Sequence, residues 1–102
     1  MENYELTVRI KRFDNDTKGK ILKVPVLASN HFHCAESALI IFRISSDILS
    51  IEGFKRENDG VYFDVQEIYG DTINYKNDST EECYTAMCDN ALEYGIYGAT
   101  ND

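Results

Sequence analysis

The chain has 102 residues, of which 43% are apolar, and this length accommodates one small hydrophobic core. Its 18 acidic and 10 basic residues give a net charge of −8, which argues against general affinity for nucleic acid or for an anionic membrane. No stretch reaches the ~20 apolar residues of a membrane span, and the first residues lack the pattern of a signal peptide, so we expect a cytoplasmic protein.

The first two predicted strands form a hairpin. Apolar and polar residues alternate over positions 4–11, a period of two that is typical of a half-buried strand. Residues 14–20 have the composition of a turn, and residues 22–26 predict the returning strand. Because Pro25 has no backbone N–H to donate, we expect this second strand at a sheet edge.

After Ser29 the pattern changes to that of a helix, which we expect to begin between Asn30 and His33, with Asn30 as the better cap by residue type. Ile40 and Ile44 lie on one flank of this helix and predict an exposed apolar strip. The remaining apolar and small residues share one arc of the helical wheel: Cys34, Ala35, Ala38, Ile41, Phe42, Ser45 and Ile48.

Two further strands are predicted at residues 50–56 and 61–68. They flank the segment 57–60, which ends in Asp-Gly, a strong hairpin signal between two such runs. Gly53 interrupts the alternation of the first strand and predicts a β-bulge. Residues 72–75 are expected to add a short strand.

The last predicted element is a helix that begins near Asp78 and ends at Gly95, with an apolar stripe that includes Tyr84 and Met87. The predicted fold class is therefore α+β, a two-layer sandwich in which an antiparallel sheet carries two helices on one face, in the order β-β-α-β-β-(β)-α. We expect one domain over residues 1–95 and a frayed tail over residues 96–102.

Histidine and cysteine supply the candidates for a soft-metal site: His31, His33, Cys34, Cys83 and Cys88. Structural zinc sites pair ligands two to four residues apart, whereas Cys83 and Cys88 are five residues apart on the predicted helix. We expect no metal and no cofactor. Cys83 and Cys88 are interpreted as small buried side chains, and an odd cysteine count favours free thiols.

Cys34 is the one candidate nucleophile. It lies at the predicted helix start, where the helix dipole lowers a thiol pKa, and it is close in sequence to His31 and His33. No third group that would orient a base is evident, and the six glycines are scattered and form no phosphate-binding loop. We therefore expect a protein without enzymatic activity.

Charge is unevenly distributed along the chain. Residues 1–56 hold nine basic and seven acidic residues, a net of +2, whereas residues 57–102 hold one basic and eleven acidic residues, a net of −10. Six of the seven tyrosines also lie in the second half, which predicts either a surface that binds a basic protein or one that only maintains solubility. The candidate partner-binding residues are Tyr62 and Asp64 on one strand face, and Glu82, Asp89 and Glu93 along the last helix.

Three basic residues, Arg9, Lys11 and Lys23, are expected to share the solvent face of the first hairpin. Stacking recognition of RNA needs aromatic side chains interleaved with such residues, and none lies on that face. We interpret it as a solvated sheet face, and we expect no direct contact with nucleic acid.

In its general type, an acidic domain of about 100 residues that is rich in Asn, Ile, Lys and Tyr, the chain resembles accessory proteins of phages and mobile elements, the anti-CRISPR inhibitors among them. The stretch from Val26 to Ala38, in which a strand leads through Ser29 and Phe32 into a helix start, is similar to uncharacterised small β-β-α-β domains of gut bacteria and their phages. The anti-CRISPR resemblance implies that acidic side chains occupy a basic nucleic-acid channel of a CRISPR effector.

Two hypotheses for function follow. The first is a non-enzymatic inhibitor or modulator that presents an acidic, tyrosine-rich surface to a basic nucleic-acid-handling protein such as a CRISPR effector, without membrane contact. The second is a self-assembling or scaffold domain, a homodimer that uses an edge strand or the flank formed by Ile40 and Ile44.

Overall fold

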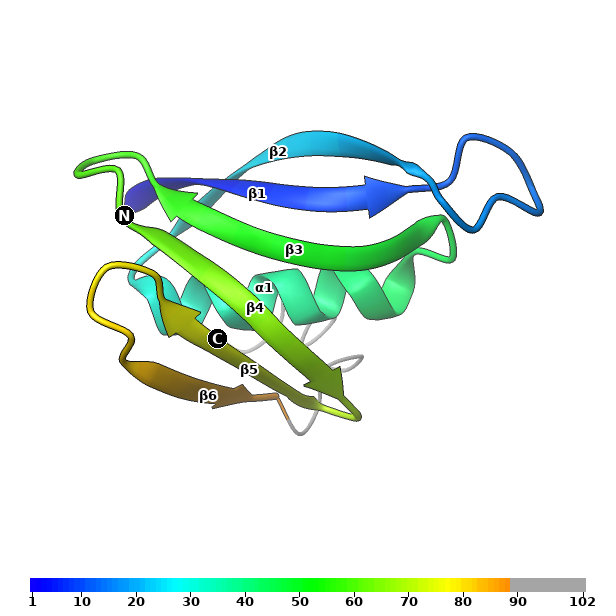
Figure 1. Ribbon diagram of the computed structural model, residues 1–102. Coiled ribbons are helices and arrows are strands. Elements are labelled where there is room, and N and C mark those ends of the chain that lie inside the picture. The colour runs from blue at the N-terminus through cyan, green and yellow to red at the C-terminus, as the bar shows by residue number, and fades with distance from the viewer. Residues whose placement is uncertain (89–102) are drawn as a thin grey trace, which may run out of the picture.

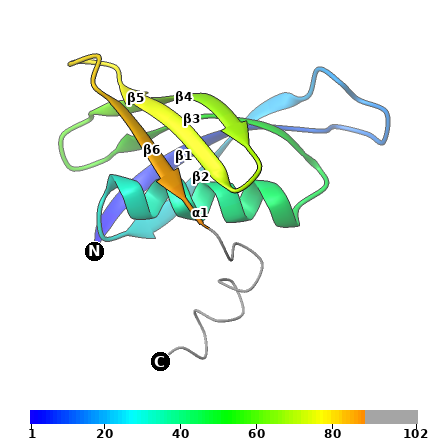
Figure 2. The same cartoon turned by 90° about the horizontal axis from the view of Figure 1, so that it is seen from below.

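The computed structural model describes residues 1–88, which form one six-stranded antiparallel sheet and one helix. The sheet has the order β2-β1-β3-β4-β5-β6, and the helix α1 lies across one of its faces (Figures 1 and 2). Within this part of the chain, no helix is both long and apolar enough to cross a membrane. The elements are β1 (Glu2–Ile10), β2 (Lys20–Ala28), α1 (His31–Ile44), β3 (Ile48–Arg56), β4 (Tyr62–Tyr69), β5 (Thr72–Asn77) and β6 (Cys83–Met87).

The first hairpin and the start of the helix confirm the sequence predictions. Pro25 pairs with Glu5 in the register of β1 with β2, and β2 is an edge strand of the sheet. The side chain of Asn30 caps α1, because its Oδ1 accepts a hydrogen bond of 2.8 Å from the backbone N–H of His33.

The core lies between α1 and the concave face of the sheet. The helix contributes small side chains such as Cys34 and Ala38, which let it approach the large aromatic residues of the strands closely. Leu39 is fully buried, whereas Ile40 and Phe42 are only partly buried against this core. The aromatic residues of the strands in the core are Tyr4, Phe54, Phe63 and Tyr75.

The prediction of a second helix from Asp78 is wrong, and with it the sandwich with two helices on one face. Residues 83–87 form strand β6, which pairs with β5 and presents Ala86 to the core while Met87 is 55% exposed. The structure is a small α+β fold with a single helix in the described part of the chain. The predicted end of that helix at Gly95 and the tail over residues 96–102 lie outside the described residues.

The misleading signal came from the turn between β5 and β6. The residues that look like a helix cap instead close a hairpin, in which Asn77 Oδ1 accepts hydrogen bonds from the backbone N–H groups of Ser79 and Thr80. Glu81 has a positive φ of 64°, which a helix does not permit. In the segment that follows, side chains alternate with a period of two, and Tyr84 and Ala86 face the core. This segment is therefore a strand and not a helix.

Candidate functional site

Strands β3 and β4 are paired only near the hairpin that joins them. Their paired residues run from Gly53 with Asp64 to Lys55 with Tyr62, three pairs in all. Beyond Gly53 the two strands diverge toward the end of the sheet that also carries the β1–β2 loop (Figure 1). A groove of about 370 Å³ lies between them.

Two β-bulges flank the place where the strands part. The register of β3 with β1 shifts at Glu52, and the register of β4 with β5 shifts at Gln66. The first confirms the bulge predicted from Gly53, and each bulge bends its strand. Gly53 is required here because the Tyr62 ring occupies the space that a Cβ would need. Local sequence irregularities therefore shape the groove.

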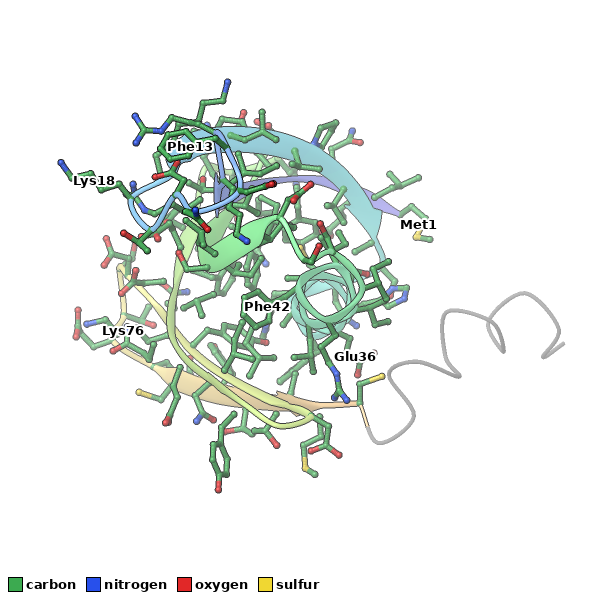
Figure 3. The ribbon with its side chains drawn as sticks, turned by 90° about the vertical axis from the view of Figure 1, so that its right-hand side faces the viewer. Met1, Phe13, Lys18, Glu36, Phe42 and Lys76 are labelled. Atoms are coloured by element: carbon green, nitrogen blue, oxygen red, sulfur yellow. The ribbon has the colours of Figure 1, made fainter. Side chains whose placement is uncertain are left out.

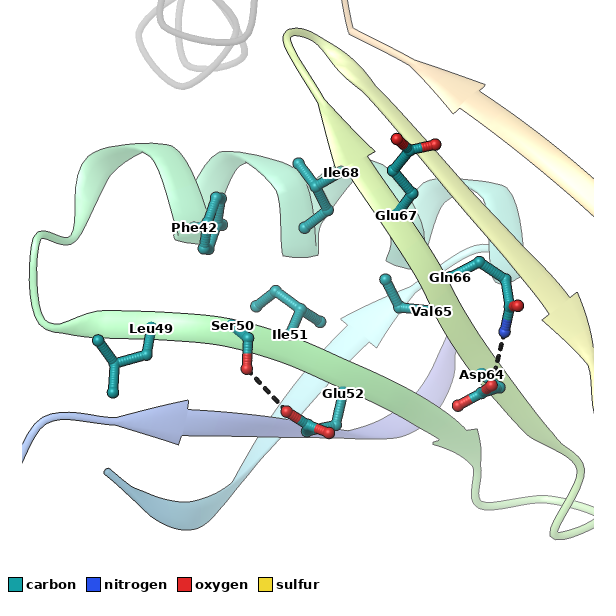
Figure 4. A pocket seen from close by; sticks show the side chains of 10 residues that line it. All are labelled: Phe42, Leu49, Ser50, Ile51, Glu52, Asp64, Val65, Gln66, Glu67 and Ile68. Carbon is teal, nitrogen blue, oxygen red and sulfur yellow. Dashed lines mark hydrogen bonds between the residues drawn. The ribbon is translucent and has the colours of Figure 1, made fainter. Parts of the chain in front are cut away.

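The groove has an apolar floor and an acidic rim. Phe42 of α1 and Ile51 of β3 meet Val65 and Ile68 of β4 in the space between the helix and the two strands (Figure 4). The polar residues of the lining are Ser50, Glu52, Asp64, Gln66 and Glu67. This lining combines water-excluding surface with hydrogen-bond acceptors.

The three carboxylates of the rim differ in the positive charge around them, because Glu52 lies beside Arg9 and Asp64 pairs with Lys76 in the register of β4 with β5. The Arg9 Nε lies 3.6 Å from Glu52, and the Gln66 amide donates a hydrogen bond of 2.6 Å to Asp64. Among residues 1–88, no lysine or arginine forms an ion pair with Asp64 or Glu67. The groove therefore fits a ligand that carries cationic groups around an apolar one.

The structure brings together only part of the predicted partner-binding set. Asp64 lies on the rim, whereas Tyr62 packs over Gly53 and is not part of the groove lining. Glu82 lies in the turn before β6, so it cannot begin the acidic helical stripe that the sequence predicted. The other two members, Asp89 and Glu93, lie outside the described residues.

Sequence reasoning missed Glu52, Glu67 and the apolar floor. Glu52 belongs to the half of the chain with a net positive charge, so the charge count along the sequence hides it. The signal that could have found the groove is Gly53, because an expected bulge beside a hairpin marks a place where two strands can separate.

The cysteines do not form a reactive site in the described part of the chain. Cys34 is fully buried, and burial raises the pKa of its thiol to about 12, so the lower pKa expected from its helix position is wrong. Cys83, expected to be buried, is exposed, whereas Cys88 is buried. No three His, Cys, Asp or Glu side chains of residues 1–88 come together in a way that would hold a metal ion.

His31 belongs instead to an aromatic cluster at the start of α1. Its ring stacks on Phe63 with centroids 4.8 Å apart and also contacts Tyr75 and Tyr84. These contacts fill the space around the imidazole, which gives it a role in packing. Comparison with protein-family models, with curated proteins and with solved structures found no match for this chain.

Proposed function

We propose that this chain is a non-enzymatic protein-binding module whose groove between β3 and β4 receives a basic segment of a partner protein, with an apolar side chain at the centre of that segment. One observation carries the proposal: Phe42, Ile51, Val65 and Ile68 line the same groove as three carboxylates. Apolar surface at the centre of a site supplies affinity, and charges at its rim supply orientation and speed of association.

The partner class follows from the charge of the rim. Glu52, Asp64 and Glu67 attract lysine and arginine side chains, and attraction to a large basic surface is strongest on proteins that bind nucleic acid. A nucleic-acid-handling protein such as a CRISPR effector offers such a surface. Binding there places carboxylates where phosphates would otherwise lie, so the module inhibits or modulates by competition.

A peptide titration tests this proposal. The probe is a short peptide in which one phenylalanine is flanked by arginines on both sides, added to the isotope-labelled chain and followed by NMR. We expect the largest shifts at the amides of Ile51, Val65 and Ile68, because these residues line the groove. A peptide of the same length with glutamates in place of the arginines is the control and should cause none of these shifts.

Two variants localise the effect. Replacement of Asp64 by Asn together with Glu67 by Gln removes two rim charges, whereas Glu57→Gln removes one exposed charge outside the groove lining. The first variant should weaken peptide binding about tenfold, and the second should leave it nearly unchanged. Shifts spread over the whole acidic surface, or equal effects of the two variants, would overturn the proposal.

A further inference from the structure

The loop between β1 and β2, residues 11–19, is an ordered projection that we call the finger. Asp16 is only 4% exposed and fixes its shape. The carboxylate of Asp16 accepts hydrogen bonds from the Arg12 guanidinium at 2.8 and 3.1 Å and from the backbone N–H groups of Arg12 and Lys18 at 3.0 Å each. Four hydrogen bonds to one buried carboxylate give this loop a defined conformation.

The finger carries an exposed aromatic ring among basic residues. Phe13 is 62% exposed, and the Arg12 guanidinium lies 5.6 Å from the centre of its ring. Lys11 and Lys18 are the other basic residues of the loop, and Asp14 is its only acidic residue besides the paired Asp16. Phe13 and Lys18 lie at the outer margin of this end of the molecule, whereas Phe42 lies inside (Figure 3).

The finger and the groove are complementary in chemistry. The groove offers an apolar floor under carboxylates, and the finger offers Phe13 beside cationic side chains. We infer, on the basis of the proposed function, that a second copy of this chain occupies the groove when the partner protein is absent, with Phe13 of its finger on the apolar floor and its basic side chains against Glu52, Asp64 and Glu67.

The finger cannot serve the groove of its own chain. Gly19 at the base of the finger packs against Leu49, a residue of the groove lining, and a Cβ at Gly19 would lie 2.8 Å from Leu49 Cδ1. The finger therefore leaves the sheet beside the groove, and the Asp16 hydrogen bonds hold Phe13 in solvent. A rigid loop in this position reaches a neighbouring molecule and does not fold back.

Because the finger and the groove lie side by side in each chain, their placement also sets the symmetry of the dimer. The finger and the diverging parts of β3 and β4, between which the groove lies, are at the same end of the sheet (Figure 1). A two-fold axis between them places each finger over the other copy's groove, so that both contacts form at once in a closed dimer. The edge strand β2 is a poorer interface, because Pro25 interrupts its hydrogen-bonding edge and Lys20 and Lys23 repel a second copy.

Sedimentation equilibrium of the full chain tests the inference. The wild type should form dimers that dissociate on dilution over about a hundredfold range of concentration and on addition of salt. Phe13→Ser should be monomeric yet equally stable, because this side chain is exposed. A wild type that stays monomeric throughout, or a dimer that Phe13→Ser leaves intact, would overturn the inference.

A charge exchange gives a second and sharper test. One variant carries Lys11→Glu and Lys18→Glu, and the other carries Asp64→Lys and Glu67→Lys. Each variant alone pairs like charges in both contacts and should be monomeric, whereas the equimolar mixture pairs opposite charges in both contacts and should form a heterodimer. A mixture that remains monomeric would count against finger-to-groove pairing.

The two proposals fail in different ways. The arginine-flanked peptide is titrated into the Phe13→Ser variant, whose groove is intact. If Phe13→Ser binds the peptide but the wild type is monomeric, the dimer is overturned and the proposal of a protein-binding groove remains supported. If Phe13→Ser does not bind the peptide and the wild type does not dimerise, the proposal that the groove binds protein is overturned.

Discussion

The imidazole Nδ1 of His31 lies 2.8 Å from the hydroxyl oxygen of Tyr75, so residues 44 positions apart share one hydrogen bond at the start of α1. Burial lowers the pKa of His31 below its ordinary value of 6.5, and the nearby Arg56 lowers it further, whereas Glu82 and Glu2 oppose this shift. The neutral imidazole is therefore the form that the folded protein accommodates.

We expect stability to depend on pH through His31. The unfolded chain binds a proton at His31 more readily than the folded chain does. The free energy of unfolding is therefore at its maximum above about pH 6.5, as far as His31 contributes, and falls as the pH drops below that value. Urea unfolding at about pH 7.5 and 5.5 measures the loss. His31→Gln should reduce the difference in the free energy of unfolding between the two pH values, whereas His33→Gln should preserve that difference. Equal loss in wild type and His31→Gln would contradict the assignment.

Gly53→Ala should destabilise the fold by about 1–3 kcal/mol, because the added methyl group has no room. A Cβ at this position would lie 2.5 Å from the Phe63 carbonyl oxygen and would overlap the Tyr62 ring. Chemical denaturation measures the change. Tyr62→Ala in the same background should recover only part of the loss, since the carbonyl remains, and Gly60→Ala tests a glycine with open space but a positive φ of 74°. A Gly53→Ala variant as stable as wild type would contradict this packing.

Asp16→Asn should loosen the finger without unfolding the sheet. The Arg12 guanidinium holds the pKa of Asp16 well below its usual range, so this carboxylate stays charged and bound down to strongly acidic pH. We expect faster amide hydrogen exchange over residues 12–18 and weaker dimerisation, with exchange in β3 unchanged. Unaltered exchange in the finger would show that the Asp16 hydrogen bonds do not order it.

Thiol labelling should distinguish the cysteines. Cys83 is exposed, whereas burial keeps Cys34 protonated by raising its pKa to about 12. A disulfide reagent at neutral pH should modify one thiol quickly, and Cys83→Ser should remove that fast phase. Rapid modification of Cys34 in the folded protein would contradict its place in the core.

Local patterns predicted the first five strands and the helix, but not the fold class. The alternation in β1, the Asn30 cap and the Asp-Gly turn each act over a few residues, and the sheet and helix form where these patterns indicate. Residues 78–88 were misread because capping residues also build hairpin turns, and because Tyr84 and Met87 fit a helical period by coincidence. Pairing with β5 decided between the two structures, and a sequence pattern does not reveal that pairing.

The groove could be predicted only in part. Asp64 was among the candidate residues because it follows Tyr62 at a period of two, but Glu52 and Phe42 come from other elements. Their meeting depends on the divergence of β3 and β4, which is a property of the whole sheet. The basic residues of the first hairpin were interpreted as a solvated face because no aromatic side chain interleaves with them on the strands, and Phe13 lies in the loop.

The most direct test of the account is calorimetric titration of the arginine-flanked peptide into the Phe13→Ser variant at low and moderate salt. The double replacement of Asp64 by Asn and Glu67 by Gln is compared with Glu57→Gln in the same background. We expect peptide binding that weakens as salt is added. The double replacement should lower the affinity and also make it less dependent on salt, whereas Glu57→Gln should change neither the affinity nor its salt dependence. No binding by the variant with an intact groove, or an equal response to both sets of replacements, would contradict the account.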